Sequence, residues 1–185
     1  MSEKVVIYDT TLRDGAQTEG ILFSAEDKLD VLRELDSFGM DFVECGWPGS
    51  NPTDDEFFDK VKNQQLRKSK VVAFGSTRKA DVSPEEDLNL IALAESPAEW
   101  CCIVGKAWSF QVEEALNISL DKNLDMVEDS VRYLVGKGKH VIFDAEHFFD
   151  GYKSDRKYAI NVLRAAESGG AEWLVLCDTN GGTIP

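Results

Sequence analysis

The stretch VVIYDTTLRDG, residues 5–15, begins as an apolar, β-branched run and ends in charged residues. An apolar run bounded by turn residues is typical of a buried strand. Arg13 and Asp14 follow it closely, so a strong cation and a carboxylate stand side by side after the strand. Taken alone, the pair is also compatible with an ordinary exposed loop ion pair. Only the rest of the sequence can decide between a site and a loop.

Similar apolar runs recur along the chain and predict further strands. They are DFVECG (41–46), KVVAFG (70–75), WCCIVG (100–105), HVIFDAE (140–146) and EWLVLCD (172–178). The runs are continuous rather than alternating, which is typical of parallel strands that are covered on both faces.

Helical patterns lie between these runs. Ser24 and Asp27 form a capping-box variant that opens a helix, and Gly39 ends it. Ser83 and Pro84 are expected to open a second helix. Further helical repeats occupy residues 127–135 and 158–166, each shortly before a glycine. The alternation of strand and helix predicts a parallel α/β fold.

Polar residues follow the carboxyl ends of most of the predicted strands. This pattern favours a barrel over a doubly wound sheet. A doubly wound nucleotide-binding fold would show G-x-G-x-x-G after its first strand, and RDGAQTEG does not. Active sites assembled from many strand ends are typical of a TIM (β/α)8 barrel. We expect residues 1–185 to form one domain, a TIM barrel truncated to about its first six β/α units, without strands seven and eight.

The composition excludes several classes of partner. Acidic residues outnumber basic ones by 34 to 20, so sequence-independent binding to nucleic acid is not expected. No apolar run approaches the ~18 residues of a membrane helix, and the N-terminus does not resemble a signal peptide. The four cysteines form no CxxC pair, which indicates reduced, buried thiols in a cytoplasmic protein rather than a zinc site.

Four motifs carry a family resemblance: DTTLRDGAQ (9–17), VECGWPGSNP (43–52), FDAEHFFDGYK (143–153) and LCDTNGGTIP (176–185). Together they resemble the citramalate synthase and 2-isopropylmalate synthase family, metal-dependent acyl-CoA condensing enzymes of the DRE-type TIM-barrel group. That group also includes homocitrate synthase and hydroxymethylglutaryl-CoA lyase. GWPGSNP and DAEHFFDGYK are most similar to citramalate synthases, and the resemblance covers essentially the whole chain.

The resemblance implies roles for the residues after the first two strands. Asp14 would ligate a divalent metal ion, Mg²⁺, Mn²⁺ or Zn²⁺. Arg13 would face the oxygen of an α-keto acid and of the enolate formed from acetyl-CoA, and Glu44 would hold Arg13 in place. Even without the resemblance, Glu44 is unusual because an unpaired carboxylate in the apolar run FVECG would be costly.

The later motifs supply the other candidates. Glu146 follows the fifth strand beside Phe148 and Phe149, and is the candidate base for the acetyl methyl proton. Thr179 and Gln17 would bind the substrate. On residue type alone, Thr179 is also compatible with ordinary turn chemistry before two glycines.

The family's remaining metal ligands are an H-x-H pair on strand seven, and this sequence does not contain that motif. Its histidines are His140 and His147. The family's C-terminal regulatory region is also absent. Because one carboxylate does not hold a divalent ion firmly, we expect this chain to be inactive by itself.

The reaction implied for the intact enzyme is a Claisen-type condensation of acetyl-CoA with pyruvate to give citramalate. Its partners would be the α-keto acid and acetyl-CoA, with no nucleic acid and no membrane, and we expect a homo-oligomer. Two alternatives stay open: a sister synthase or lyase with a different substrate, and a non-catalytic fragment or binding module.

Overall fold

A computed structural model describes residues 5–184, and its centre is one parallel sheet. The strands pair in chain order, β1-β2-β3-β4-β5-β6, and every pairing is parallel. Their bounds are Tyr8–Asp9, Phe42–Gly46, Lys70–Ser76, Trp100–Lys106, His140–Glu146 and Trp173–Leu176. All the predicted strands are confirmed, although β1 is shorter than the apolar run that predicts it.

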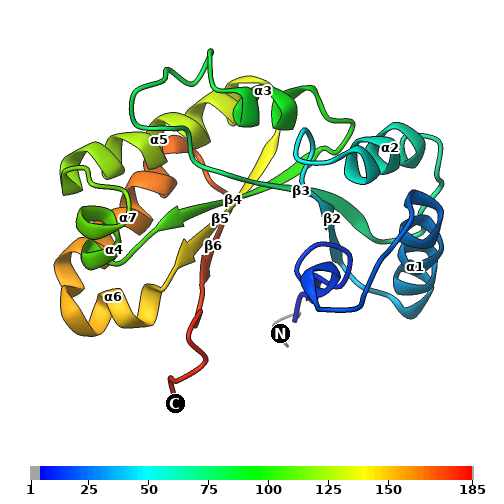
Figure 1. The fold of residues 1–185 in the computed structure, drawn as a ribbon, viewed down its shortest axis with the longest axis horizontal. Coiled ribbons are helices and arrows are strands. Elements are labelled where there is room, and N and C mark those ends of the chain that lie inside the picture. Colours follow the sequence, from blue (N-terminus) through cyan, green and yellow to red (C-terminus); the bar gives the residue numbers. More distant parts are fainter. Residues whose placement is uncertain (1–4, 185) are drawn as a thin grey trace.

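The sheet is strongly curled, with the helices on its outer, convex side (Figure 1). Phe42 in β2 lies against Trp173 in β6, with ring centroids 6.3 Å apart, although three strands separate them in the sheet. Contact across the concave side requires the sheet to bend back on itself. This is the geometry of a (β/α)8 barrel over its first six units, and the predicted fold class is confirmed.

Two long helices fall where the sequence places them. Helix α1 (Ala25–Phe38) begins at the predicted capping box of Ser24 and Asp27 and ends at Gly39, whose φ of 98° suits glycine. Helix α7 (Arg156–Gly169) ends at Gly170 in the same way. Helix α5 (Leu120–Gly136) starts earlier than its apolar repeat suggests, because Ser119 accepts a hydrogen bond from the Lys122 backbone.

The predicted start of the second helix is wrong. Helix α3 spans Leu88–Glu95, and its N-cap is Asp87, which accepts hydrogen bonds from the backbone of Asn89 and Leu90. Ser83 and Pro84 instead lie in a preceding turn, in which the Ser83 carbonyl accepts from the backbone of Glu86. The helix begins after Asp87 rather than at Ser83 because the Asp87 carboxylate accepts hydrogen bonds from two backbone N–H groups of the first turn.

Three short helices escaped the sequence analysis. They are α2 (Pro52–Val61), α4 (Ser109–Glu114) and α6 (Phe148–Ser154). Helix α2 did have a signal, since Asn51 caps it and Pro52 occupies its first turn. Helices α4 and α6 span too few turns for an apolar period to show.

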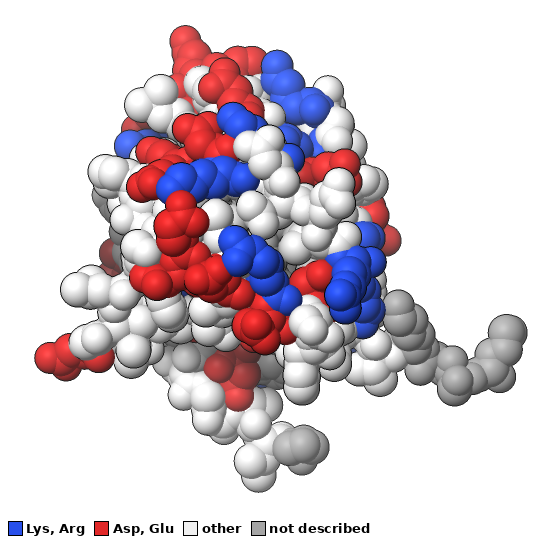
Figure 2. Space-filling view, turned by 90° about the vertical axis from the view of Figure 1, so that its right-hand side faces the viewer, with Lys and Arg blue, Asp and Glu red and all other residues white. Residues whose placement is uncertain are grey.

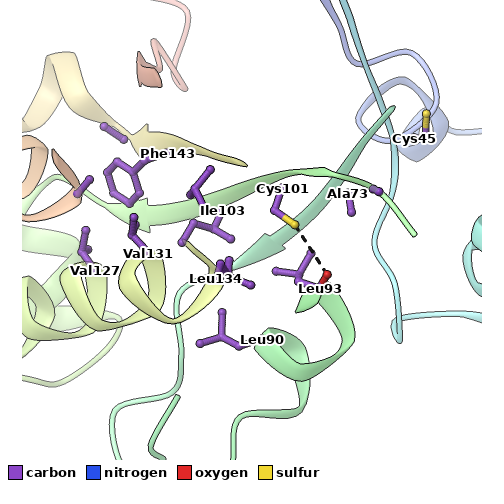
Figure 3. Close-up of a cluster of buried hydrophobic side chains, with 14 of the residues drawn as sticks. Cys45, Ala73, Leu90, Leu93, Cys101, Ile103, Val127, Val131, Leu134 and Phe143 are labelled. Atoms are coloured by element: carbon purple, nitrogen blue, oxygen red, sulfur yellow. Dashed lines mark hydrogen bonds between the residues drawn. The ribbon is translucent and has the colours of Figure 1, made fainter. Parts of the chain in front are cut away.

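Apolar side chains fill both sides of the sheet. The outer cluster packs strand residues such as Ile103 and Phe143 against α5 residues such as Val131 and Leu134 (Figure 3). In the same view, the Cys101 thiol lies 3.8 Å from the Leu93 carbonyl oxygen. A second cluster fills the concave side with Phe42, Val72, Phe74, Trp100, Cys102 and Ile142. The expectation that both faces are covered is therefore confirmed for the central strands.

The outer surface beside α1 and α2 mixes acidic and basic side chains (Figure 2). Lys60, for example, pairs with Glu26 and with Glu56, each at 2.6 Å. Such exposed pairs contribute little to stability and form no single-sign patch. Within residues 5–184, no helix is both long and apolar enough to cross a membrane.

Candidate active site

The turn after β1 is built to place Arg13. Thr10 accepts hydrogen bonds through its carbonyl from the backbone of Arg13, at 3.1 Å, and of Gly15, at 3.0 Å. Asp9 closes the same turn by accepting from the backbone and hydroxyl of Thr11. Leu12 is fully buried in the outer core and anchors the turn. The chain therefore reverses sharply, with Leu12 on the outer side of the sheet and Arg13 beside Glu44.

Arg13 and Glu44 form the ion pair that the resemblance implies, with Glu44 buried and Arg13 partly buried. The Arg13 Nε donates to Glu44 Oε1 at 2.5 Å, and the Tyr8 hydroxyl donates to Glu44 Oε2 at 2.6 Å. The Glu44 side chain is fully buried, so these two donors replace the water that a carboxylate needs. The register between β2 and β3 shifts between Glu44 and Gly46, which marks an irregularity at the end of β2.

The electrostatics of the pair favour a permanently charged guanidinium. Burial works to lower the pKa of Arg13, but the Glu44 and Asp14 carboxylates outweigh it and raise that pKa above its ordinary value. The pKa of the Tyr8 hydroxyl is raised, whereas a phenol that acts as a base would have a lowered pKa. Burial, then the nearby Cys102 and Glu44, raise the pKa of its hydroxyl well above the usual value, so it acts as a hydrogen-bond donor.

Two other groups contact the Arg13 side chain. Its Nη1 donates to the Asp14 carboxylate at 3.2 Å, and its Cζ lies 3.8 Å from the centre of the Phe74 ring. The Arg13 side chain is 17% exposed, whereas that of Asp14 is 63% exposed. Asp14 is thus on the open side of the site, and Arg13 is inside it.

The described residues do not form a divalent metal site around Asp14. Among them, the one cluster of three or more potential ligands is Glu44, Cys102 and Asp144, whose ligand atoms lie within 4.8 Å of one another. Glu44 already accepts from two donors, and burial raises the pKa of the Cys102 thiol well above its usual value. A single exposed carboxylate is too few ligands for such an ion.

The partly buried carboxyl of Asp144 was missed by the sequence analysis. Burial, and then the charge of Glu44, raise the pKa of Asp144 to about 6. A signal was present, since Asp144 precedes Glu146 by two positions in β5 and alternate strand residues share a face. Tyr8, Glu44, Cys102 and Asp144 interact electrostatically with one another, which makes this part of the site polar.

Glu146 lies at the carboxyl end of β5, beside Lys106 of β4. The two residues are register partners, and their side chains form an ion pair. They are about equally accessible, at 26% for Glu146 and 28% for Lys106. The sequence predicts apolar surroundings for Glu146 from Phe148 and Phe149. In the structure Phe148 packs in the outer core, and the neighbour of Glu146 is Lys106. A cavity of about 360 Å³ beside β3 and β4 includes both members of the pair.

Gln17 lies near Arg13 but in a different cavity from Glu146. A cavity of about 330 Å³ is lined by Arg13 and Gln17, with Lys28, Trp47 and Asp54 on its other sides. The structure thus brings together two of the predicted residues here, and places Glu146 in the neighbouring cavity.

Thr179 connects the ends of β5 and β6. Its hydroxyl oxygen accepts a hydrogen bond from the His147 backbone N–H at 2.9 Å. Nearby, His147 Nδ1 lies 3.2 Å from the Asp150 carboxylate, and Asn180 donates to the same carboxylate at 2.9 Å. These contacts give Thr179 a part in holding the turns, the alternative to substrate binding that its residue type also allows. Substrate binding by Thr179 stays a prediction.

The GWPGSNP motif is held by a buried ion pair that the sequence analysis did not anticipate. Lys28 of α1 pairs with Asp54 and donates to the Cys45 carbonyl at 3.0 Å. Asp54 in turn accepts from the Trp47 backbone at 2.8 Å. Gly46 is required because its φ is 153° and a Cβ there would lie 2.6 Å from the Asp54 carboxyl carbon.

Comparison with known proteins agrees with this geometry. The HMGL-like family model matches residues 4–185. The chain belongs to the HMGL-like family. It is 51% identical to the (R)-citramalate synthase of Geobacter sulfurreducens over 98% of this chain, and equally identical to that of Aquifex aeolicus over 100%. A 2-isopropylmalate synthase of Shouchella clausii is 30% identical over 98% of the chain.

The chain spans about a third of the length of these relatives, 34% of the Geobacter enzyme and 35% of the Aquifex enzyme. Among solved structures, the hydroxymethylglutaryl-CoA lyase of Bacillus subtilis superposes with a TM-score of 0.76 at 19% identity. The match covers 98% of this chain and 60% of that lyase. The lyase of Pseudomonas aeruginosa gives 0.75 at 20% identity. At such identities, this likeness concerns the fold alone.

Proposed function

We propose that this HMGL-like chain is the N-terminal catalytic segment of an (R)-citramalate synthase. The reaction would be acetyl-CoA plus pyruvate plus water giving (R)-citramalate and free CoA. The observation that carries the proposal is the level of identity, which is 47–51% to five such synthases. One 2-isopropylmalate synthase and two homocitrate synthases are 28–30% identical to this chain.

Arg13 is proposed to bind the keto oxygen of pyruvate. When the new carbon–carbon bond forms, this oxygen takes up the electron pair of the carbonyl and becomes an alkoxide. A fixed cation is most effective against such developing charge, because it needs no reorganisation during the reaction. The buried Glu44 supports this role, since it binds Nε and so fixes the cation, and Arg13 lines a cavity of about 330 Å³.

Glu146 is proposed to remove a proton from the acetyl methyl group. The resulting enolate carbon attacks the keto carbon, and water then cleaves the thioester to release CoA. Lys106 supports the role of Glu146 because the ion pair fixes the position of its carboxylate at the end of β5. Gln17 and Thr179 are proposed to bind the carboxylate of the keto acid from the β1 and β6 ends.

Asp14 is proposed as one ligand of a divalent ion, and no step above is routed through that ion because the described residues do not complete a site. The 185-residue chain should therefore bind Mg²⁺, Mn²⁺ or Zn²⁺ weakly and release no CoA from acetyl-CoA and pyruvate. Calorimetric titration with each metal and a thiol assay for CoA test this. Turnover by the 185-residue chain would contradict it.

We also infer a cytoplasmic, self-associating protein. Cys45, Cys101 and Cys102 are buried free thiols, as expected in a reducing compartment. Apolar side chains of β6, including Trp173 and Leu176, are partly exposed and could be covered by another copy.

The experiment that tests the substrate compares three keto acids with a synthase that contains this segment. CoA release should be fastest with pyruvate and much slower with 2-ketoisovalerate and 2-ketoglutarate. A preference for either larger keto acid would replace the proposal with a sister synthase. Cleavage of hydroxymethylglutaryl-CoA without condensation would replace it with a lyase.

A further inference from the structure

We propose that Phe74 is a positioning residue for Arg13, holding the guanidinium by its flat face while Glu44 holds it by its edge. This rests on the role proposed above for Arg13. The geometry itself is independent of that role and can be tested without measuring turnover.

The hydrogen bonds of Arg13 hold only the edge of its guanidinium: Nε donates to the buried Glu44, and Nη1 donates at 3.2 Å to Asp14, whose side chain is 63% exposed. Edge contacts of this kind leave the guanidinium free to pivot out of its plane. Arg13 Nε donates to Glu44 at 2.5 Å, and Arg13 Cζ lies 3.8 Å from the centre of the Phe74 ring. A ring packed against the guanidinium at that distance removes the pivot, because tilting would drive the guanidinium into the ring. Edge and face contacts together define both the position and the plane of the group.

Burial makes this contact stronger than a surface cation–π pair. Phe74 is only 6% exposed, and the Arg13 side chain is 17% exposed. The ring quadrupole attracts a cation more strongly where water is excluded. Arginine suits the contact better than lysine, since its planar group stacks on a ring.

The ring is itself held in place by the GWPGSNP segment. Trp47 meets Phe74 edge to face, with ring centroids 5.3 Å apart and planes at 82°. The Trp47 indole donates to Asn89 Oδ1 at 2.8 Å, and the Trp47 backbone donates to Asp54 at the same distance. The buried Asp54 thus acts on Arg13 through Trp47 and Phe74. Trp47 of this motif therefore supports the ring that packs on Arg13.

Orientation of this kind matters because a small misplacement of a charged group from the reacting atoms lowers the rate steeply. Replacing Phe74 should therefore lower kcat more than it changes KM. The same replacement should loosen Arg13 even when no substrate is present.

The test follows the Nε–H proton of Arg13 by NMR in the 185-residue chain, with Arg13→Lys identifying the signal. In the unaltered chain, the proton bonded to Glu44 should exchange slowly with water. Phe74→Leu should accelerate its exchange about tenfold, the factor expected from losing a partly buried cation–π contact. Phe74→Trp, which retains an aromatic face, should restore slow exchange.

A second series guards against simple unfolding. Phenylalanine analogues with one, two and three ring fluorines keep the shape of Phe74 but progressively weaken its attraction for a cation. Exchange should accelerate stepwise along this series. Phe143→Leu is the matched control, because Phe143 is equally a buried strand residue but lies in the outer cluster. It should lower the melting temperature and leave the Arg13 signal unchanged.

The proposal is overturned if the fluorinated analogues leave the exchange rate unchanged, or if Phe143→Leu accelerates it as much as Phe74→Leu does. The proposed function fails separately. If Arg13→Lys retains synthase activity in the longer enzyme while Phe74 still controls the Arg13 proton, the orientation stands and the catalytic role of Arg13 does not.

Discussion

The two ends of the proposed site are built in different ways. At the β1–β2 end, Glu44 is fully buried and both of its oxygens accept hydrogen bonds within the chain. At the β5–β6 end, Glu146 is a quarter exposed and pairs with one lysine, and Thr179 is held by a turn. We therefore expect the first end to be ordered before any ligand binds, and the second end to adjust to a ligand.

The largest difference should appear in stability. Glu44→Gln removes the buried partner of Arg13 and leaves that charge only the exposed Asp14, and breaking such a pair costs about 3–5 kcal/mol of unfolding free energy. Glu146→Gln breaks a partly exposed pair and should cost less than about 1 kcal/mol. Urea unfolding of both variants measures this, and equal losses would mean that the two ends are built alike.

Catalysis should also distinguish charge from geometry at the first end. In a synthase that contains this segment, Arg13→Lys keeps the charge but loses the planar fork, so kcat should fall by about two to three orders of magnitude. Glu44→Gln should lower kcat similarly, since it leaves Arg13 misplaced. Steady-state kinetics with pyruvate provide the measurement, and a near-normal kcat in either variant would make the pair structural.

A pH effect should come from Asp144, which lies between the two ends. Its pKa in the folded chain is about 6, above the unfolded value of about 3.9, so the folded state binds the proton more tightly. The contribution of Asp144 to stability is therefore present below about pH 4 and lost as pH rises through about 6, amounting to at most about 3 kcal/mol.

The groups that interact with Asp144 come from several elements: Tyr8 of β1, Arg13, Glu44 of β2, Cys102 of β4 and Cys177 after β6. Glu44 disfavours ionisation of Asp144, whereas Arg13 and the Cys102 thiol favour it. Asp144→Asn should flatten the pH dependence of thermal unfolding between pH 4 and 6. If the variant keeps the slope of the parent chain, another group is responsible.

The smallest effect concerns association at the second end. Trp173 and Leu176 of β6 are each 44% exposed, and β1 and β6 are the terminal strands of the sheet. Exposed edges and apolar surface favour self-association, which the net charge of −14 opposes mainly at low salt. Light scattering in moderate salt should detect dimers, and Leu176→Lys should reduce them. A monodisperse monomer would show that the sheet satisfies its own edges.

The sequence by itself determined the parallel α/β order, because continuous apolar runs and capping residues are local signals that the chain displays in any context. It also marked Glu44 as unusual, since an unpaired carboxylate inside FVECG would be costly. Arg13 as its partner followed from the family resemblance. The sequence placed Glu146 and Thr179 at strand ends, but it did not predict which residues they would contact.

Only the tertiary structure decided which strand residues face the concave side. Phe74, Cys102 and Asp144 occupy runs that are apolar on both faces, so alternation could not reveal their direction. The pairs Lys28–Asp54 and Lys106–Glu146 join segments distant in the sequence. The reason is physical: strand register and the packing of α1 on α2 bring these charges together, and neither can be read from one segment alone.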